Sequence, residues 1–504
     1  MKHFLCFVLS AVFLLAASAK ENVDFLAKPL SAGKASLTQN AYQVTQILGN
    51  TNFSPDLRMP LQLIYNSAND QSGIFGYGWS SPQLESSAIP ERDGVLWTTP
   101  WGEKIKFFIK QKADKNTLEL YKEEMKGTRD YFAPYSDWNA DGKGGALSFT
   151  GKRGYAGWKF IYRNGALSSI TAPSGRSLSF VYNRGLLSGI TQNNTAFIEL
   201  NYDKKQLSSM KINGVERTFT YENGKIVMFP KTLQGKTLTI TRPRLASVRT
   251  GTLDPIQFSY DGHGYLAEVK QGAFSDRFTV QHETAEQRAA FLRSKQEKKI
   301  TPYYGPVAGR ILSDSFFTYR YGDDKPGNVT LTNQLKQTAK YDFDEKTGVF
   351  KIKEFSGKEY TIYYFMRYDV AYLGKIRQVV DGRNRVVMGY RYDKLTGNLD
   401  YNRSGDVTLI TRRAADQPHP EPVLRMSYNG KGMPTEIMRL NPKGQTYSSV
   451  KYTYTADSQP QSITNGQNTT RLTYNPFGYP LNIFDTFGRK IIRTYDKYNR
   501  PVET

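Results

Sequence analysis

The chain has 504 residues, and its 34 tyrosines, 28 phenylalanines and 42 glycines form a composition typical of strands and turns. The formal net charge is +22, but lysine and arginine are spread along the whole chain. This distribution favours charged strand faces that discourage edge-to-edge pairing over one concentrated polyanion site. The single cysteine, Cys6, excludes a disulfide framework, and a chain of this length can bury a large core without one.

The first residues have the pattern of a secretory signal. Lys2 precedes an apolar run from Phe4 to Ala17, and Ala17-Ser18-Ala19 supplies the small-x-small pattern of a signal peptidase site. We therefore predict a signal peptide over residues 1–19 and export to the periplasm, the cell surface or the medium. The apolar run is too short to span a membrane, and no later stretch approaches the roughly 18 apolar residues of a spanning helix.

Residues 20–150 are predicted to form an N-terminal β region, and one stretch of it has the spacing of a calcium loop. Asp137, Asn139 and Asp141 alternate and Gly142 follows, as in loops whose alternate oxygens point at a calcium ion. Ser148 stands where such a loop has its bidentate glutamate, and no helix is expected on either side. The candidate metal ligands are Asp137, Asn139 and Asp141, and an ordinary turn rich in Asp, Asn and Gly is the alternative.

From about residue 151 to residue 504 the sequence repeats a short unit that begins at a tyrosine. Four consecutive units begin at Tyr162, Tyr182, Tyr202 and Tyr221, so the tyrosines step by 20, 20 and 19 residues. Slightly longer units begin at Tyr260, Tyr428, Tyr454, Tyr474 and Tyr495. A fixed period of this kind predicts a repeat architecture.

Each unit is predicted to be a β-hairpin. Apolar residues alternate before the tyrosine, as in Leu178, Phe180 and Tyr182, so one strand face is buried. Polar residues and usually a glycine, such as Gly224 in the fourth unit, then form a turn. The second strand carries Leu or Pro and, three positions later, Ile or Val, which predicts a bulge between them. The tyrosines are interpreted chiefly as core residues.

The pattern Tyr-Asp-x-x-Gly-x-Leu/Pro-x-x-Ile/Val resembles the YD repeats of bacterial Rhs proteins, insecticidal toxin-complex shell subunits and animal teneurins. Upstream, Gly76-Tyr-Gly-Trp-Ser80 and Pro100-Trp-Gly102 are similar to the segment that precedes the repeats in Rhs proteins. The resemblance implies a long β-sheet ribbon that coils into a shell-like or solenoid sheet. It does not extend to the toxin, because Asp254-Pro255 is not followed by the glycine and leucine of the family's Asp-Pro-x-Gly-Leu motif. We therefore expect no payload.

Residues 271–310, approximately, interrupt the repeats and contain one short predicted helix, from Thr284 to Lys299. Thr284 and Gln287 have the spacing of a capping box. Residues 303–400 keep strand character with uneven spacing, and the proline-rich residues 417–422 are predicted to form a surface loop. The expected fold class is all-β, a YD-repeat hairpin array with this one helix inserted.

The sequence offers little catalytic chemistry. His263, His282 and His419 have no partner at the spacing of a metal site or a catalytic triad, and no nucleophile or phosphate-binding motif is found. We expect no enzyme activity and no cofactor beyond the candidate calcium ion.

The leading interpretation is an exported structural or interaction protein, a shell or adhesive scaffold. Its partner would be a protein or a cell-surface glycan, with no specific nucleic acid. One alternative is a toxin-system shell component that lacks its payload, and a second is a glycan-binding or polyanion-binding protein of the envelope.

Overall fold

The computed structural model describes residues 31–37, 41–109, 129–132, 138–151, 155, 157–228, 235–282, 284–296, 309–322, 327–344, 347–364, 376–392, 407–413, 421–429 and 433–503. The predicted signal peptide, Asp137, His419 and most of the proline-rich loop lie outside these residues. Within the described ranges, no helix has the length and apolar character needed to cross a membrane.

The described chain is built almost entirely of antiparallel strands, so the all-β fold class predicted from the sequence is confirmed. The N-terminal segment contains β1 (Ser31–Ala32), β2 (Ala35–Ser36), β3 (Gln43–Asn50), β4 (Pro60–Asn66), β5 (Ser72–Gly73), β6 (Gly76–Tyr77), β7 (Trp79–Ser80) and α2 (Pro82–Glu85). β3, β4 and β7 form a three-stranded sheet. The short helix α2 was not predicted from the sequence.

A first long sheet follows the N-terminal segment. Its strands are β8 (Ser87–Glu91), β9 (Gly94–Thr98), β10 (Lys104–Ile109), β11 (Arg129–Phe132), β12 (Trp138–Lys143), β13 (Ala146–Gly151), β14 (Lys159–Arg163), β15 (Ala166–Thr171), β16 (Ser177–Asn183), β17 (Leu186–Gln192), β18 (Thr195–Asp203), β19 (Gln206–Ile212), β20 (Val215–Met228), β21 (Leu238–Thr250), β22 (Ile256–Tyr260), β23 (Leu266–Gln271) and β24 (Phe274–Arg277). Consecutive strands pair with one another, and β8 also meets β15 at one bridge between Ser87 and Ala166. The start of this sheet therefore returns onto its own later strands.

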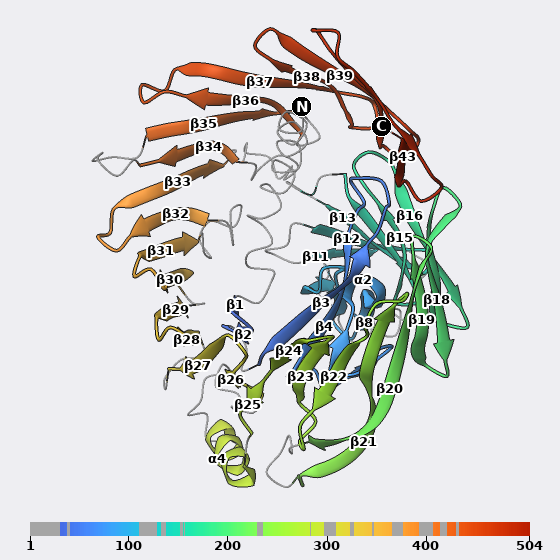
Figure 1. The fold of residues 1–504 in the computed structure, drawn as a ribbon, viewed down its shortest axis with the longest axis vertical. Coiled ribbons are helices and arrows are strands. Elements are labelled where there is room, and N and C mark those ends of the chain that lie inside the picture. The colour runs from blue at the N-terminus through green and yellow to red at the C-terminus, as the bar shows by residue number, and fades with distance from the viewer. Residues whose placement is uncertain are drawn as a thin grey trace.

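A second sheet of 17 strands continues the ribbon, again with consecutive strands as neighbours. It comprises β25 (Thr279–Val280), β26 (Ile311–Ser313), β27 (Phe317–Tyr321), β28 (Asn328–Asn333), β29 (Thr338–Asp344), β30 (Val349–Lys353), β31 (Glu359–Tyr364), β32 (Ile376–Asp381), β33 (Val386–Tyr392), β34 (Val407–Arg412), β35 (Glu421–Tyr428), β36 (Pro434–Leu440), β37 (Thr446–Tyr454), β38 (Pro460–Asn465), β39 (Asn468–Tyr474), β40 (Pro480–Asp485) and β41 (Lys490–Ile492). β42 (Thr494–Tyr495) and β43 (Pro501–Glu503) pair beyond it. Figure 1 shows that the two sheets follow one curve, which brings β43 back beside the first sheet.

The predicted helix lies where the first sheet gives way to the second. α4 (Ala285–Gln296) follows β25 and precedes β26 (Figure 1). The backbone N–H of Gln287 donates to the Thr284 hydroxyl at 3.1 Å, and that of Thr284 donates to the Gln287 side chain at 2.9 Å. This reciprocal pair is the predicted capping box, and it satisfies two backbone groups that would otherwise lack partners.

The repeat units have the predicted turn and bulge. In the second unit Arg184 and Gly185 have φ of 49° and 81°, which is the left-handed pair of a tight hairpin turn. Tyr182 faces Leu187 while Val181 faces Gly189, so Ser188 is an extra residue between the two apolar positions. The same register shift recurs in the units that begin at Tyr162, Tyr202, Tyr260, Tyr428, Tyr454 and Tyr474.

The fourth unit departs from the predicted hairpin. β20 runs straight through Gly224 and pairs with β21 on both sides of it, with a register shift at Tyr221. Gly224 has no positive φ, but a Cβ at this position would lie 1.9 Å from the Arg244 guanidinium carbon. A glycine is therefore needed at position 224, because the Arg244 side chain passes over this position to pair with Glu222 at 2.6 Å.

The N-terminal segment fills the inner side of the first sheet. β3 and β4 lie within the curve of β16 to β24 (Figure 1), and their apolar side chains share one core with the sheet. The backbone N–H of Leu266 donates to the Tyr65 hydroxyl at 3.1 Å, and the Trp79 indole N–H donates to the Tyr260 hydroxyl at 2.8 Å. The curved sheet therefore depends on this segment to cover its apolar face.

Candidate functional site

The repeat tyrosines do more than fill the core. Pairing between β17 and β18 stops at Gly189, so the Leu187 carbonyl lies beyond the last strand pair. The Tyr202 hydroxyl, from the next unit, donates to this carbonyl at 2.8 Å. Burial is the largest cause of the raised pKa of Tyr202, so the hydroxyl stays protonated and remains a donor.

The same bond recurs along the ribbon, and we call the set the tyrosine–carbonyl ladder. In each case the hydroxyl donates to the carbonyl of the Leu or Pro that pairs with the tyrosine of the preceding unit, at 2.5 to 2.9 Å. The donors are Tyr182, Tyr202, Tyr221, Tyr260, Tyr454, Tyr474 and Tyr495, and the acceptors are Leu167, Leu187, Leu207, Leu245, Pro434, Pro460 and Pro480. Successive hairpins are thus joined where their backbone pairing ends.

A second feature, which we call the closing contact, joins the last repeats to an N-terminal loop. It is formed by Asn52, Phe53, Arg58, Tyr479 and Asn499. The Tyr479 hydroxyl donates to the Phe53 carbonyl at 2.6 Å and accepts from the Arg58 guanidinium at 3.2 Å. The Asn499 amide donates to the Asn52 carbonyl at 2.9 Å. Turns of the last repeats therefore rest on an N-terminal loop.

That N-terminal loop also touches the first sheet. Asn213, in the turn between β19 and β20, accepts from the Asn52 backbone N–H and donates to the Asn50 carbonyl. Gln192, at the end of β17, accepts from the backbone N–H of Ser54 at 2.8 Å. Residues 50–58, which we call the wedge, therefore lie between the first sheet and the last repeats.

A buried ion-pair cluster lies where the two sheets meet. The Lys34 ammonium contacts Asp276 of β24 at 2.7 Å and Asp314, which precedes β27, at 2.8 Å. The side chains of Asp276 and Asp314 are only 10% and 1% exposed. Burial opposes the charge of Asp314, but hydrogen bonds from Lys34, Tyr319 and the backbone together hold its pKa below the usual range. One lysine thus forms an ion pair with a carboxylate from each sheet.

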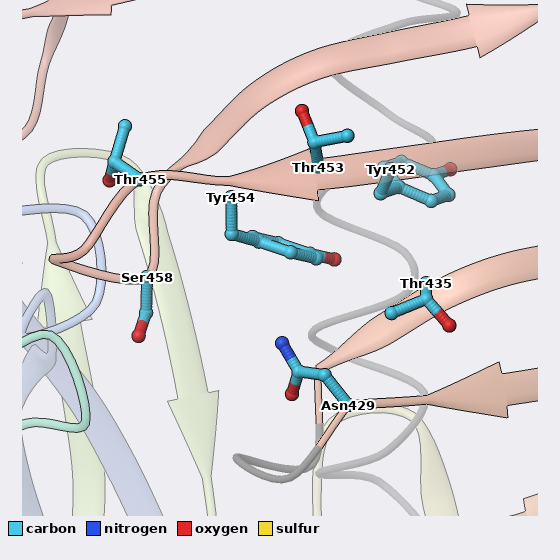
Figure 2. A pocket seen from close by; sticks show the side chains of 7 residues that line it. All are labelled: Asn429, Thr435, Tyr452, Thr453, Tyr454, Thr455 and Ser458. Atoms are coloured by element: carbon cyan, nitrogen blue, oxygen red, sulfur yellow. The ribbon is translucent and has the colours of Figure 1, made fainter.

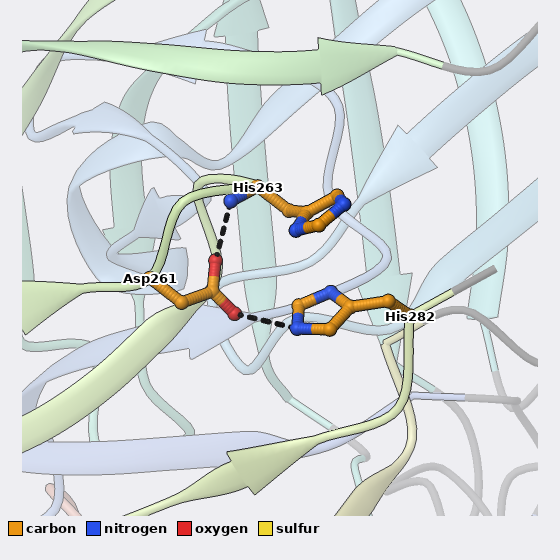
Figure 3. A group of neighbouring side chains, drawn as sticks. All are labelled: Asp261, His263 and His282. Atoms are coloured by element: carbon orange, nitrogen blue, oxygen red, sulfur yellow. Dashed lines mark hydrogen bonds and ion pairs between the residues drawn. The ribbon is translucent and has the colours of Figure 1, made fainter. Parts of the chain in front are cut away.

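A second cluster, which contains two histidines, joins the same two sheets. Asp261 and His263 belong to the turn between β22 and β23, and His282 follows β25. The two imidazoles face each other (Figure 3). Their ring centroids lie 4.0 Å apart and their planes meet at 24°. His282 Nε2 lies 3.4 Å from the Asp261 carboxylate. Burial is the largest cause of a lowered pKa at His282, and His263 acts in the same direction while Asp261 opposes it.

The sequence interpretation found no partner for these histidines at the spacing of a metal site, and the structure brings Asp261, His263 and His282 together. The sequence feature that could have revealed the cluster is the spacing of Asp261 and His263, which places both side chains in one tight turn. His282 lies 19 positions beyond His263 and reaches it only because the hairpin of β23 and β24 reverses the chain.

The predicted calcium ligands are only partly described. Asn139 and Asp141 lie in β12, which pairs regularly with β13, and Asp137 lies outside the described residues. Asp141 accepts a hydrogen bond from the Ser148 hydroxyl at 2.8 Å, directly across the hairpin. The chain reverses at Gly144 and Gly145, which have positive φ, and not at Gly142. Calcium binding at Asp137, Asn139 and Asp141 stays a prediction.

One open pocket of about 360 Å³ lies over the C-terminal repeats (Figure 2). Its lining is uncharged and rich in hydroxyl groups, from Asn429, Thr435, Tyr452, Thr453, Tyr454, Thr455 and Ser458. The Tyr454 hydroxyl already donates to Pro434 in the ladder. Such a lining offers hydrogen bonds but no group that would work as a strong acid or base.

Comparison with known proteins gives a family match for one segment. Residues 49–107 match a family described as a domain of unknown function, DUF6531. The matched segment includes the whole wedge and β4, but only the last two residues of β3. A search of curated proteins finds no match for the chain.

Solved structures show distant likenesses. The Tc holotoxin pore of Photorhabdus luminescens is 11% identical over 90% of this chain and 27% of its own, with a TM-score of 0.38. The TcdB2–TccC3 structure is 10% identical over 90% of this chain and 24% of its own, with a TM-score of 0.29. A porin-like protein from Bacteroides uniformis is 9% identical over 53% of this chain and 94% of its own, with a TM-score of 0.18. The chain thus spans about a quarter of the toxin chains that it matches.

Proposed function

We propose that the protein is an exported, non-catalytic scaffold of the YD-repeat type, wrapped around its own N-terminal segment. The observation that carries this proposal is the closing contact, in which the last repeats bind residues 52–58. A ribbon whose last repeats bind a loop that also contacts its first sheet resists opening, and the tyrosine–carbonyl ladder stiffens each step between these contacts. Such a frame suits a protein that presents a fixed surface to a protein or glycan outside the cell.

The scaffold proposal can be tested by opening the ribbon. We expect the double variant Tyr479→Ala and Asn499→Ala to remain folded in its individual hairpins but to expand, with a larger radius of gyration in small-angle X-ray scattering. The variant should also lose retention on cells or envelope material that retain the native chain. Tyr447→Ala, at a tyrosine that is 66% exposed, is the matched control. An unchanged radius in the double variant would contradict the role of the closing contact.

A second candidate is a shell component whose cargo is a separate chain, which the curvature of the two sheets favours. Co-purification of a defined polypeptide that becomes protease-sensitive in the double variant would support this candidate. A third is an envelope protein that binds polyanions, for which retention on heparin should fall steeply with salt. Steady turnover of a polysaccharide or peptide by the purified chain would contradict the non-catalytic proposal in all of its forms.

A further inference from the structure

We propose that Asp261, His263 and His282 form a binding site for a transition metal of the zinc class, which ties the first sheet to the second. The three side chains offer two imidazoles and one carboxylate, and their nearest ligand atoms all lie within 4.8 Å of one another. Neutral imidazole and carboxylate are the common protein ligands of Zn²⁺, and three of them leave a fourth position for water.

The carboxylate is already fixed in direction. Asp261 Oδ1 accepts hydrogen bonds from the backbone N–H groups of His263 and Tyr265, both at 2.9 Å. Oδ2 is therefore the oxygen that faces His282 Nε2, at 3.4 Å (Figure 3). Two ligands bonded tetrahedrally at about 2.0–2.1 Å from one ion lie about 3.4 Å apart, so this pair has the required separation.

The backbone next to His282 is held in place by the second sheet. The backbone N–H of Gln281 donates to the Arg310 carbonyl at 2.8 Å, and the backbone N–H of Gly309 donates to the Gln281 carbonyl at 3.0 Å. Thr284, two residues later, caps the start of α4. The imidazole therefore projects from ordered backbone that belongs to a different sheet from Asp261 and His263.

The histidine rings need one adjustment to share an ion. Imidazole nitrogens bind metals in the plane of the ring, and the two planes are nearly parallel, at 24°. One ring must rotate out of the stack so that both nitrogens converge. His282 can rotate, because its side chain is 37% exposed. Binding would replace a ring stack by a bond between sheets.

The inference can be tested on the mature chain after chelation and removal of the chelator. Titration with ZnCl₂ in a calorimeter should give one site per chain, and CoCl₂ should give the visible absorption bands of a tetrahedral Co²⁺ centre. Saturating Zn²⁺ should raise the melting temperature, since a ligand that binds only the folded state stabilises it. His263→Ala, His282→Ala and Asp261→Asn should each weaken binding at least tenfold and abolish the rise in melting temperature.

The variants are chosen so that loss of folding and loss of binding can be distinguished. Asn429 and Asn475 already cap equivalent turns, so Asp261→Asn keeps the cap and removes the charge. Asp485→Asn changes a capping aspartate in another repeat and should leave Zn²⁺ affinity unchanged. Affinity that survives His263→Ala and His282→Ala in folded protein, or the absence of binding by the native chain, would overturn the site.

Discussion

Removing one hydroxyl from the tyrosine–carbonyl ladder should destabilise the ribbon by a measurable amount. Tyr202→Phe keeps the ring and deletes the bond of 2.8 Å to the Leu187 carbonyl. A hydrogen bond of this kind contributes about 0.5–1.5 kcal/mol net, and a half-buried carbonyl left without its donor adds to the loss. We therefore expect the free energy of unfolding to fall by about 1–2 kcal/mol, with no cavity formed.

The assay is equilibrium unfolding in urea, in which the midpoint should fall and the slope should stay the same. Tyr447→Phe is the control, because Tyr447 is 66% exposed. Adding Tyr454→Phe, in the other sheet, should roughly double the loss, since distant sites add. If Tyr202→Phe lowered the free energy of unfolding no more than Tyr447→Phe does, the repeat tyrosines would stabilise the ribbon by packing alone. Their hydrogen bonds would then not join the hairpins.

Three further perturbations follow from buried groups. Burial raises the pKa of Glu85 from 4.5 to about 7. The stability gained from the protonated Glu85 side chain is therefore complete below about pH 4.5 and is lost as the pH rises through about 7. This amounts to about 3 kcal/mol, and Glu85→Gln should flatten that decline in urea midpoints measured from pH 5 to 8. Lys34→Met should cost about 3 kcal/mol by leaving two buried carboxylates unpaired, and its melting temperature should recover partly at low pH. Gly224→Ala should lower the free energy of unfolding by about 1–3 kcal/mol, because the new methyl group displaces Arg244. Gly262→Ala is the control: its methyl group meets open space, so the loss should be under about 1 kcal/mol. Equal losses in the two variants would contradict the steric role of Gly224.

The repeat unit could be predicted from sequence because its determinants are local. Alternation before each tyrosine sets the buried strand face, and the three-residue spacing after the turn requires the extra residue that Ser188 provides. The capping box at Thr284 is equally local, since both partners lie within one helical turn. Each of these features depends on residues only a few positions apart.

The fourth unit was predicted incorrectly because a glycine has two uses that look alike in sequence. Gly185 is needed for positive φ, whereas Gly224 is needed to let the Arg244 side chain pass. The second use depends on a residue 20 positions away on a neighbouring strand. The hydroxyl role of the repeat tyrosines was missed for a similar reason, because the acceptor lies in the preceding unit.

The candidate sites depend on contacts that the sequence pattern does not contain. His282 meets His263 through a chain reversal, and Tyr479 meets Phe53 only after the whole ribbon has curved. No periodicity links the partners of such contacts. The structure was needed to bring them together.

The closing contact also constrains the order in which the chain can fold. Nearly every strand pairs with the strand next to it in sequence, so hairpins can form one after another as the chain emerges. The hydrogen bond from Tyr479 to Phe53 joins residues 426 positions apart and can form only when the last repeats are in place. Until then the wedge is held on one side alone. Folding should therefore end with a slow, concerted docking step, and a chain interrupted before Tyr479 would expose the surface that the last repeats cover.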